Sequence, residues 1–483
     1  MLPKLRSTAN SLNIRAGLLG RSKFTWKYRV RNYTYKVERT NSNCSRGIHR
    51  FSTFSPLNNK INNPQHQRNS GNLRSNGKKG SQSIESKDSD NMNKKSSLRG
   101  QESSNGSIVL DELINQDNQQ VKEKPSQAIH KTLDWSPKAE GKMYEIPNSL
   151  LGKLETLGAL EKQKKSFSFF SNPVLLHRKV TTKLYNILQR SKNVSSASGR
   201  YVLDGSAGSG RSISLLQAEI FAFSHPNYVV LGLHNCERWV DSSSPYSYDA
   251  SLQSWVQPEL IKEFLTSVMN VNSKALGTLT TSKSYELVPG KSIPAGTDLH
   301  TLLRKITSKS ELSVRFCQSF LQELDAATKQ PNSSVNVLFV IDNLSVLSVP
   351  TKYKNTENHN LLPCDFYFIN ILYQYLSGSL SFHRGTIFAA TSSQPRIQTP
   401  SLDVALGKAK LDPYIPINKA IYDSTKSLQV IPMEPYSVDE SLSVMEHLVT
   451  SNVCLESVES HRQNHVLSGG NPRLFFDTCT RLT

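Results

Sequence analysis

Residues 200–216 constrain the fold of this chain more than any other stretch. A short apolar run at 201–203 leads into a glycine-rich turn, and a helical pattern of apolar residues follows. From Gly205 to Ser212 the spacing is G-x-x-x-x-G-x-S, which is typical of a phosphate-binding P-loop, except that arginine stands where lysine is expected. A strand, a glycine turn and a helix in this order predict a nucleotide-binding α/β domain.

The residue types in this turn suit phosphate binding. Glycines permit backbone angles that side chains forbid, so successive N–H groups can turn toward one anion. The following helix adds unpaired N–H groups and about half a positive charge. We predict that the loop contacts nucleotide phosphates and that Ser212 also holds magnesium. The loop residues are Gly205, Ser206, Ala207, Gly208, Ser209, Gly210, Arg211 and Ser212.

Arg211 is the departure from the usual loop. It would reach the terminal phosphates, but a planar guanidinium is bulkier than an ammonium group and does not sit in the same place. We therefore expect binding to survive, whereas fast phosphoryl transfer is not expected. The alternative is a strand-to-helix turn that binds nothing.

Four further apolar segments predict strands at 228–233, 335–342, 385–391 and 428–432. Their alternation with helical patterns predicts a parallel sheet covered by helices, with the ligand at the carboxyl ends of the strands. Helices are expected at 258–269 and 298–328, and residues 236–258 read as an irregular aromatic loop.

The third of the five predicted strands ends in an acidic residue. Asp342 is placed as in a Walker B site, where a carboxylate holds magnesium through water. Asn343 follows, where many P-loop ATPases have a catalytic glutamate, so the site is better suited to holding a nucleotide than to hydrolysing it. Thr391 and Ser392 follow the next strand, where a polar sensor would face the γ-phosphate.

The last 50 residues have a helical pattern. Ser437 and Glu440 form a capping box, and Asn471 before Pro472 is a second helix start. The expected buried stripe of the first helix is Val438, Leu442, Met445 and Val449. Arg473 either belongs simply to the second helix start or approaches a bound phosphate.

The net charge of +19 is concentrated near the N-terminus. Residues 1–100 hold 21 Lys and Arg against 4 acids, and the remainder is balanced to within +2. The first 55 residues are rich in Arg and Ser with one acid, which predicts a mitochondrial transit peptide cleaved near 50–55. No apolar run is long enough to span a bilayer. Six cysteines without a C-x-x-C pair suit a reducing compartment.

Composition divides the chain into five parts. We expect a transit peptide at 1–55, a disordered Asn/Ser/Lys-rich linker at 56–125, and a basic segment at 126–198. The P-loop domain follows at 199–434, and a helical segment ends the chain at 435–483. Between residues 161 and 200 nine basic residues accompany Phe167, Phe169 and Phe170. They are Lys162, Lys164, Lys165, Arg178, Lys179, Lys183, Arg190, Lys192 and Arg200. This mixture suits RNA contact and stacking, or equally a solvated helix surface with inward-packed phenylalanines.

Several of these motifs together resemble one family, the mitochondrial small-subunit ribosomal protein also called death-associated protein three. The resemblance runs from about residue 166 to the C-terminus. It rests on residues 168–173 and 201–217, on Trp239 with Tyr246 and residues 257–258, on residues 340–343, and on the terminal Gly-Asn-Pro-Arg. The Asn-rich N-terminal extension suggests a fungal member.

The resemblance implies a P-loop domain related to AAA+ ATPases in the head of the mitochondrial small ribosomal subunit. It implies a bound purine nucleotide, usually GTP or GDP with ATP as the alternative, together with Mg²⁺ held by Ser212 and Asp342. The partners it implies are small-subunit rRNA, neighbouring proteins of the head and contacts with the large subunit. Guanine rests on the resemblance alone, because residues 418–421 begin like an Asn-Lys-x-Asp motif but lack its aspartate.

Two other functions remain open from the sequence. One is an active matrix AAA+-like or signalling NTPase, which would hydrolyse nucleotide and lose that activity when Asp342 is replaced by alanine. The other is an RNA-binding module with a vestigial P-loop, which would carry no nucleotide. A structural ribosomal protein with a nucleotide and little or no hydrolysis ranks first.

Overall fold

The computed structural model describes residues 23–30, 33–40, 134–192, 194–330, 333–392 and 398–480. In the N-terminal unit two antiparallel strands pair, β1 (Lys23–Val30) and β2 (Tyr33–Thr40). The rest of the expected transit peptide, the expected linker at 56–125 and residues 126–133 lie outside the described residues. No helix in the described ranges is long and apolar enough to cross a membrane.

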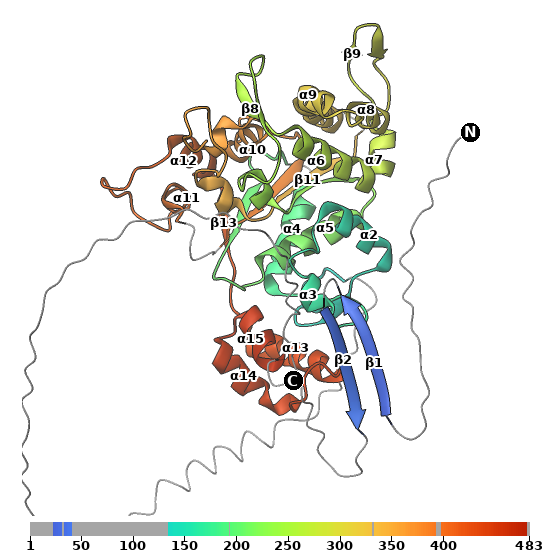
Figure 1. Ribbon diagram of the computed structural model, residues 1–483, viewed down its shortest axis with the longest axis vertical. Helices are drawn as coiled ribbons and strands as arrows, with labels where there is room; N and C mark the ends of the chain where they lie inside the picture. The colour runs from blue at the N-terminus through green and yellow to red at the C-terminus, as the bar shows by residue number, and fades with distance from the viewer. Residues whose placement is uncertain are drawn as a thin grey trace, which may run out of the picture. The chain divides into compact units, whose positions relative to one another are not determined.

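A five-stranded parallel sheet forms the centre of the larger unit (Figure 1). Its spatial order is β13–β5–β12–β11–β6. The strands are β5 (Arg200–Asp204), β6 (Tyr228–Leu233), β11 (Asn336–Ile341), β12 (Gly385–Ala390) and β13 (Gln429–Pro432). All five strands predicted from the sequence are confirmed, and so is the P-loop NTPase-like α/β fold class. One strand, β12, separates the P-loop strand β5 from β11, which precedes Asp342.

Side chains of the sheet alternate between two buried cores, as strand geometry requires. Val202, Phe339 and Ile387 face one core, while Leu203, Val340 and Phe388 face the other. The second core is covered by α2 (Asn148–Leu157), α4 (Lys179–Ser191) and α5 (Arg211–Phe223). The first is covered by α6 (Pro258–Val271), α7 (Ser273–Thr278), α8 (Leu299–Ile306), α9 (Ser310–Lys329), α10 (Tyr367–Ser377), α11 (Pro400–Ala405) and α12 (Lys419–Thr425).

Two segments differ from the sequence-based expectation. The helix expected over 298–328 is two helices, α8 and α9, because side chains near the break bond to the backbone. Ser313 Oγ donates to the carbonyl of Ile306 (3.1 Å), and Thr307 Oγ1 donates to that of Leu303 (2.8 Å). The expected irregular loop at 236–258 contains a hairpin of β7 (Ser247–Asp249) and β8 (Ser254–Val256).

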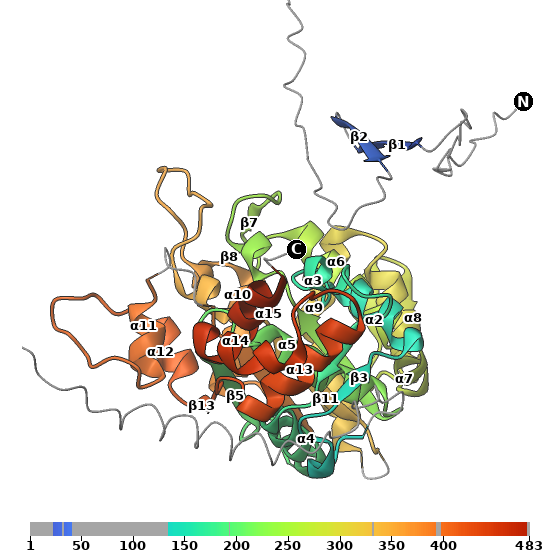
Figure 2. The same cartoon turned by 90° about the horizontal axis from the view of Figure 1, so that it is seen from below.

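Smaller elements complete the unit. A hairpin of β9 (Tyr285–Val288) and β10 (Lys291–Ile293) precedes α8. Before the P-loop, β3 (Met143–Glu145) pairs with β4 (Val174–Leu176), and the short α3 (Lys164–Phe167) lies between them in the chain. The C-terminal helices are α13 (Val438–Thr450), α14 (His461–Ser468) and α15 (Pro472–Thr480). Figure 2 shows these helices lying across one end of the α/β body.

The two helix starts predicted in the C-terminal segment are confirmed. Ser437 Oγ accepts from the Glu440 N–H (3.1 Å), and Asn471 Oδ1 accepts from the N–H groups at the start of α15. The predicted stripe of α13 is wrong in part. Val438 is exposed, and the fully buried apolar positions are Val444, Met445 and Leu448. The stripe is rotated because α13 packs against the β3–β4 hairpin and α15 in a third apolar cluster.

A buried ion pair fixes the P-loop helix to the sheet. Glu219 on α5 is fully buried, and its Oε1 lies 2.7 Å from Nε2 of His234, just after β6. Burial lowers the pKa of His234, but the charge and hydrogen bond of Glu219 outweigh it, and the net effect raises the pKa above its ordinary 6.5. The protonated imidazole is therefore favoured in the folded state.

Replacing His234 by Gln should lower the free energy of unfolding by about 3 kcal/mol near pH 6, because the Glu219 carboxylate is then buried without its cation. Because the pKa of His234 is raised in the folded state, its ion pair contributes its full stabilisation at pH values below the unfolded pKa of 6.5. This contribution to the free energy of unfolding is lost as the pH rises through the folded pKa. Urea unfolding at a series of pH values should show the gap between wild type and variant narrowing above about pH 6.5. A gap that does not change with pH would contradict this assignment.

Candidate functional site

The P-loop has the backbone shape that its glycines predict. It joins β5 to α5, and Gly208 and Gly210 have φ angles of +81° and +96°. Gly210 is the N-cap of α5, so the first N–H groups of this helix follow the loop directly. A Cβ atom at Gly205 would lie 2.8 Å from Cβ of Met433, so this position also requires glycine. The loop therefore offers successive backbone N–H groups to one anion.

A cavity of about 640 Å³ lies beside the second half of this loop. The volume is within the range of small-molecule sites. Of the predicted site residues, Gly208, Ser209, Gly210, Arg211, Ser212 and Asp342 line it. Thr391, Ser392 and Arg473 also line it, as do Lys162, Lys165 and Glu237. Side chains from the carboxyl ends of several strands therefore meet here, as expected for an open α/β sheet.

The first half of the loop is held by the C-terminal segment instead. Asn471 Nδ2 donates to the carbonyl of Ala207 (2.8 Å) and to Oγ of Ser206 (3.3 Å). The N–H of Arg473 donates to the carbonyl of Gly208 (3.2 Å). Gly205, Ser206 and Ala207 are thus not among the residues that line the cavity, although the sequence predicted phosphate contacts for all eight loop residues.

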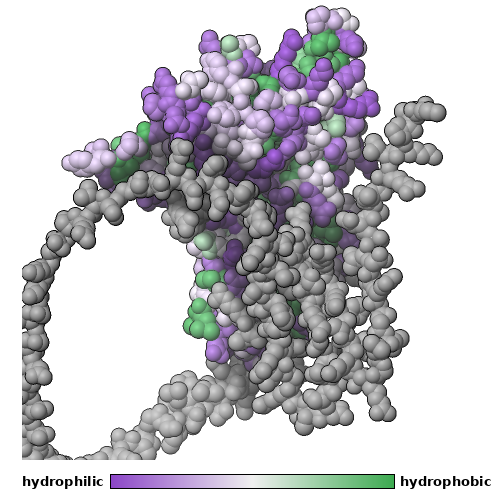
Figure 3. Space-filling view, in the orientation of Figure 1, coloured by the Kyte–Doolittle hydropathy of each residue, from purple (hydrophilic) through white to green (hydrophobic). Residues whose placement is uncertain are grey.

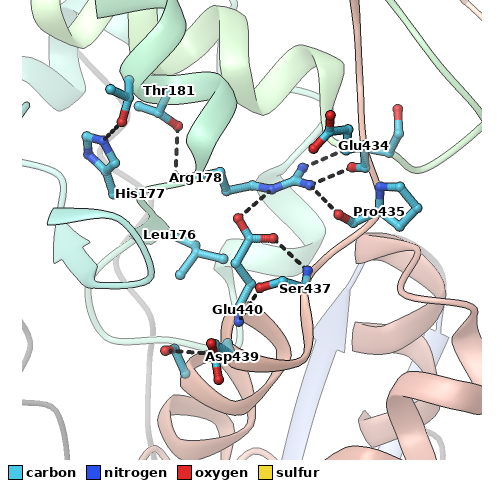
Figure 4. A network of polar contacts seen from close by, with 12 residues as sticks. Leu176, His177, Arg178, Thr181, Glu434, Pro435, Ser437, Asp439 and Glu440 are labelled. Atoms are coloured by element: carbon cyan, nitrogen blue, oxygen red, sulfur yellow. Dashed lines mark hydrogen bonds and ion pairs between the residues drawn. The ribbon is translucent and has the colours of Figure 1, made fainter. Parts of the chain in front are cut away.

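Arg178 makes a second connection between the loop and the C-terminal segment (Figure 4). Its Nη1 donates to the carbonyl of Ser209 (3.0 Å), and Nη2 donates to the carbonyls of Glu434 (2.6 Å) and Pro435 (3.2 Å). Its Nε lies 3.6 Å from a carboxylate oxygen of Glu440 on α13. The sequence had grouped Arg178 with a basic surface, but the side chain is buried and joins three parts of the fold.

Arg211 is directed toward the end of β12. Its Nη1 donates to Oγ1 of Thr391 (2.7 Å), which in turn donates to Oδ1 of Asp204 (2.6 Å). Burial lowers the pKa of Arg211, while Asp204 and Asp342 act in the opposite direction. The guanidinium is therefore already engaged by the sheet, so its position differs from that of a lysine extended along the phosphates.

Asp342 directly follows β11, and its side chain is 4% exposed. The Nζ atom of Lys162 lies 2.7 Å from its Oδ2. Next to it, Asn343 has a left-handed backbone, and its Nδ2 donates to Oε1 of Glu237. The sequence placed Lys162 only among the basic residues between 161 and 200, and neither Lys162 nor Glu237 was predicted to belong to the nucleotide site. Lys162 is 180 residues away from Asp342 and gave no local signal, whereas Glu237 lies four residues after the end of the apolar strand β6, in a short 3-10 helix (Cys236–Trp239).

The site fits a phosphate group better than it fits magnesium. The glycine cradle and the helix start leave N–H groups for phosphate, and the buried Ser209 Oγ has no hydrogen-bond partner in the described chain. Ser212 and Asp342 supply the oxygen ligands that magnesium prefers. The Asp342 carboxylate is already paired with an ammonium group, however, so a metal ion there would compete with Lys162. No cluster of metal-binding side chains occurs among the described residues.

Comparison with known proteins gives a consistent result. Residues 175–478 match the family described as mitochondrial ribosomal death-associated protein 3. The chain is 57% identical over 378 residues to the small ribosomal subunit protein mS29 of Schizosaccharomyces pombe, covering 78% of this chain and 79% of that protein. It is 22% identical over 313 residues to mS29 of Mus musculus, covering 62% of this chain and 78% of that protein.

The similarity to solved structures is weaker than the sequence similarity to the mS29 proteins. A Walker-type ATPase of Pyrococcus abyssi superposes with a TM-score of 0.35 at 12% identity, over 62% of this chain and 65% of that chain. At this level the likeness adds nothing to the strand order described above.

Replacing Gly208 by Ala should lower the free energy of unfolding of the nucleotide-free protein by roughly 2 kcal/mol. The φ of +81° disfavours any side chain, and the new Cβ would lie 2.6 Å from Cβ of Arg473 and 2.7 Å from Oδ1 of Asn471. Urea unfolding measures the change, and limited proteolysis reports whether α15 has separated from the loop.

Gly152→Ala is the matched control for this substitution. Gly152 lies inside α2, and nothing is within 4 Å of its added Cβ, so alanine should be neutral or stabilise the helix by up to about 1 kcal/mol. If Gly208→Ala leaves both stability and protease resistance unchanged, the docking of the C-terminal segment on this loop is not needed for the fold.

Proposed function

We propose that this chain, which belongs to the mitochondrial ribosomal death-associated protein 3 family, is a structural protein of the mitochondrial small ribosomal subunit that carries a purine nucleotide. The ribosomal role and the mitochondrial location follow from its membership of the family, of which it is a fungal member. The bound nucleotide and the absence of hydrolysis are proposals about this chain. The observation that supports them is that the P-loop lines the cavity with its second half while the C-terminal segment binds its first half.

Three parts of the chain form the walls of the cavity. A ligand bound there would contact all three and so hold them together. The P-loop forms one wall, and the ends of β11 and β12 form another. Residues before α4 and the C-terminal helices form the third, with Phe170, His447 and Phe476 among them. A nucleotide that binds the folded protein alone would stabilise this arrangement by mass action. This suits a component that has to keep its shape within a large assembly.

Two side chains argue against rapid hydrolysis. Arg211 is engaged by Thr391, and Asn343 has no carboxylate with which to activate water. Guanine is proposed from the family resemblance alone. Asn418, which begins the incomplete guanine motif, is used as the N-cap of α12, where its Oδ1 accepts from the N–H of Ile421 (3.2 Å). GTP or GDP is the first expectation, and ATP or ADP is the alternative.

Acid extraction of purified mitochondrial small subunits should release about one additional purine nucleotide per particle relative to particles that lack this chain. Chromatography and mass spectrometry identify the base and the number of phosphates. The free protein should hydrolyse neither GTP nor ATP above background. Particles that contain the chain but no additional nucleotide would contradict the proposal and favour a vestigial P-loop.

An active NTPase is the second candidate, and one contact favours it. Glu237 lies at the cavity and bonds to Asn343, so a neighbouring strand supplies a carboxylate close to where the usual glutamate is missing. If this carboxylate activates water, the free protein will show turnover, and Glu237→Gln will abolish it without abolishing nucleotide binding. Turnover that is lost in this way would replace the structural proposal.

The basic segment suggests where rRNA is contacted. Lys162, Arg178 and Arg200 have internal partners, so the nine basic residues do not form one surface. Lys179, Lys183 and Arg190 are exposed on α4 at a spacing that places them on one helix face. We call these three residues the α4 stripe, and they line a groove whose lining also includes Asn186 and four acidic residues, Glu140, Glu434, Asp439 and Glu440. The spacing of the three basic side chains in the α4 stripe suits contacts with successive phosphates of an RNA backbone.

The C-terminal helices offer a different kind of surface. Leu455, Val466 and Leu467 are each more than 60% exposed, and Figure 3 shows hydrophobic residues over this part of the molecule. An apolar patch of this kind suits a protein neighbour better than RNA. Neighbouring proteins of the small-subunit head are the partners that the family resemblance implies.

Replacing both Lys179 and Lys183 by Glu should weaken binding to small-subunit rRNA and reduce the slope of log affinity against log salt by about 2, one for each phosphate contact. Filter binding to a transcript of that rRNA at several salt concentrations measures both. Lys274 and Lys291 are exposed lysines on α7 and β10, and replacing both by Glu is the matched control. Equal slopes for the two variants would exclude the α4 stripe as the RNA contact.

A further inference from the structure

We propose that Lys162 takes the place of the divalent cation at Asp342, so that the nucleotide is held by a protein ammonium group instead of magnesium. This inference rests on the proposed nucleotide site. It departs from the expectation that Ser212 and Asp342 hold Mg²⁺, and it assigns a nucleotide contact to a residue far outside the P-loop.

The position of Lys162 is the first observation. It lies between α2 and α3, lines the cavity beside the P-loop, and places Nζ 2.7 Å from Oδ2 of Asp342. The Asp342 side chain is 4% exposed, and that of Lys162 is 38% exposed. The carboxylate is thus held within the protein while the ammonium group remains partly open to a ligand. Lys162 lies before residues 175–478, so the family match does not include it.

The charges of the cavity are the second observation. The P-loop has no lysine, and Arg211 is bonded to Thr391. Arg178 uses its nitrogens on carbonyl groups of Ser209 and of the segment before α13. An ammonium group has three N–H donors, and Asp342 accepts one of them. Lys162 therefore has donors left with which to bind phosphate oxygens, as the missing P-loop lysine would.

Competition for the carboxylate is the third observation. Magnesium requires oxygen ligands at about 2.0–2.1 Å in a near-octahedral arrangement. An ammonium group at hydrogen-bond distance from Oδ2 occupies that side of Asp342, and a second cation next to it would be repelled. The simplest way to neutralise both Asp342 and the phosphates is the ammonium group already present. Binding of a nucleotide should then need little or no magnesium.

The test is a titration of the purified full-length chain with fluorescent GDP and ADP analogues, in magnesium and in excess EDTA. Wild-type affinity should differ by less than about threefold between the two conditions. Lys162→Met should weaken binding in EDTA by about tenfold or more, and magnesium should restore part of the loss because Asp342 is then free for the metal. Lys164→Met is the matched control, since Lys164 is an exposed lysine on the neighbouring α3 that does not line the cavity, and this variant should bind like wild type.

Three results would overturn the inference. Wild-type binding that disappears in EDTA would show that the metal, and not Lys162, neutralises the site. Equal binding by Lys162→Met and wild type in EDTA would show that Lys162 does not contact the nucleotide. If no variant binds either analogue in either condition, the proposed nucleotide site itself is wrong, and this inference is wrong with it. Thermal unfolding of each variant confirms that the protein compared is folded.

Discussion

The docking of the C-terminal segment on the P-loop is the contact on which the rest of this structure depends. Asn471 and the N–H of Arg473 bind the carbonyls of Ala207 and Gly208, and Arg178 binds the carbonyl of Ser209. A loop used for phosphate turns its N–H groups toward the ligand, so its carbonyl groups point away and need other partners. Here those partners come from outside the sheet, and they fix α13–α15 to the α/β body.

The binding of the P-loop carbonyl groups by other parts of the chain explains how the charged side chains around the cavity are arranged. Arg178 is buried because it serves the carbonyls of two segments, and Arg211 is buried because it serves the end of β12. Both guanidinium groups stabilise the fold and so are poorly placed to move during a reaction. A motor or a switch needs such groups to change partners, whereas a structural protein benefits from keeping them fixed. The geometry therefore agrees with a site that holds its ligand.

Local patterns predicted much of the fold and only part of the site. The strands and Asp342 were predictable, because buried strands are apolar runs between turns and functional side chains follow their carboxyl ends. The contacts of Lys162 and Arg178 were not, because their partners lie 180 and more than 250 residues away. The wrong stripe on α13 has the same cause. Its periodicity was read correctly, but the direction of burial is set by β3, β4 and α15, which local sequence does not specify.

The same long-range contacts couple ligand binding to the order of both ends of the unit. Lys162 precedes the P-loop by more than 40 residues and contacts Asp342 at the cavity, whereas Asn471 follows the loop by more than 250 residues and binds its first half. A ligand in the cavity would be enclosed by parts that come together only in the complete fold. Free energy gained on binding is then also free energy of folding for these parts, by the usual linkage between the two equilibria. A bound nucleotide would in that case stabilise the complete fold without any need for hydrolysis.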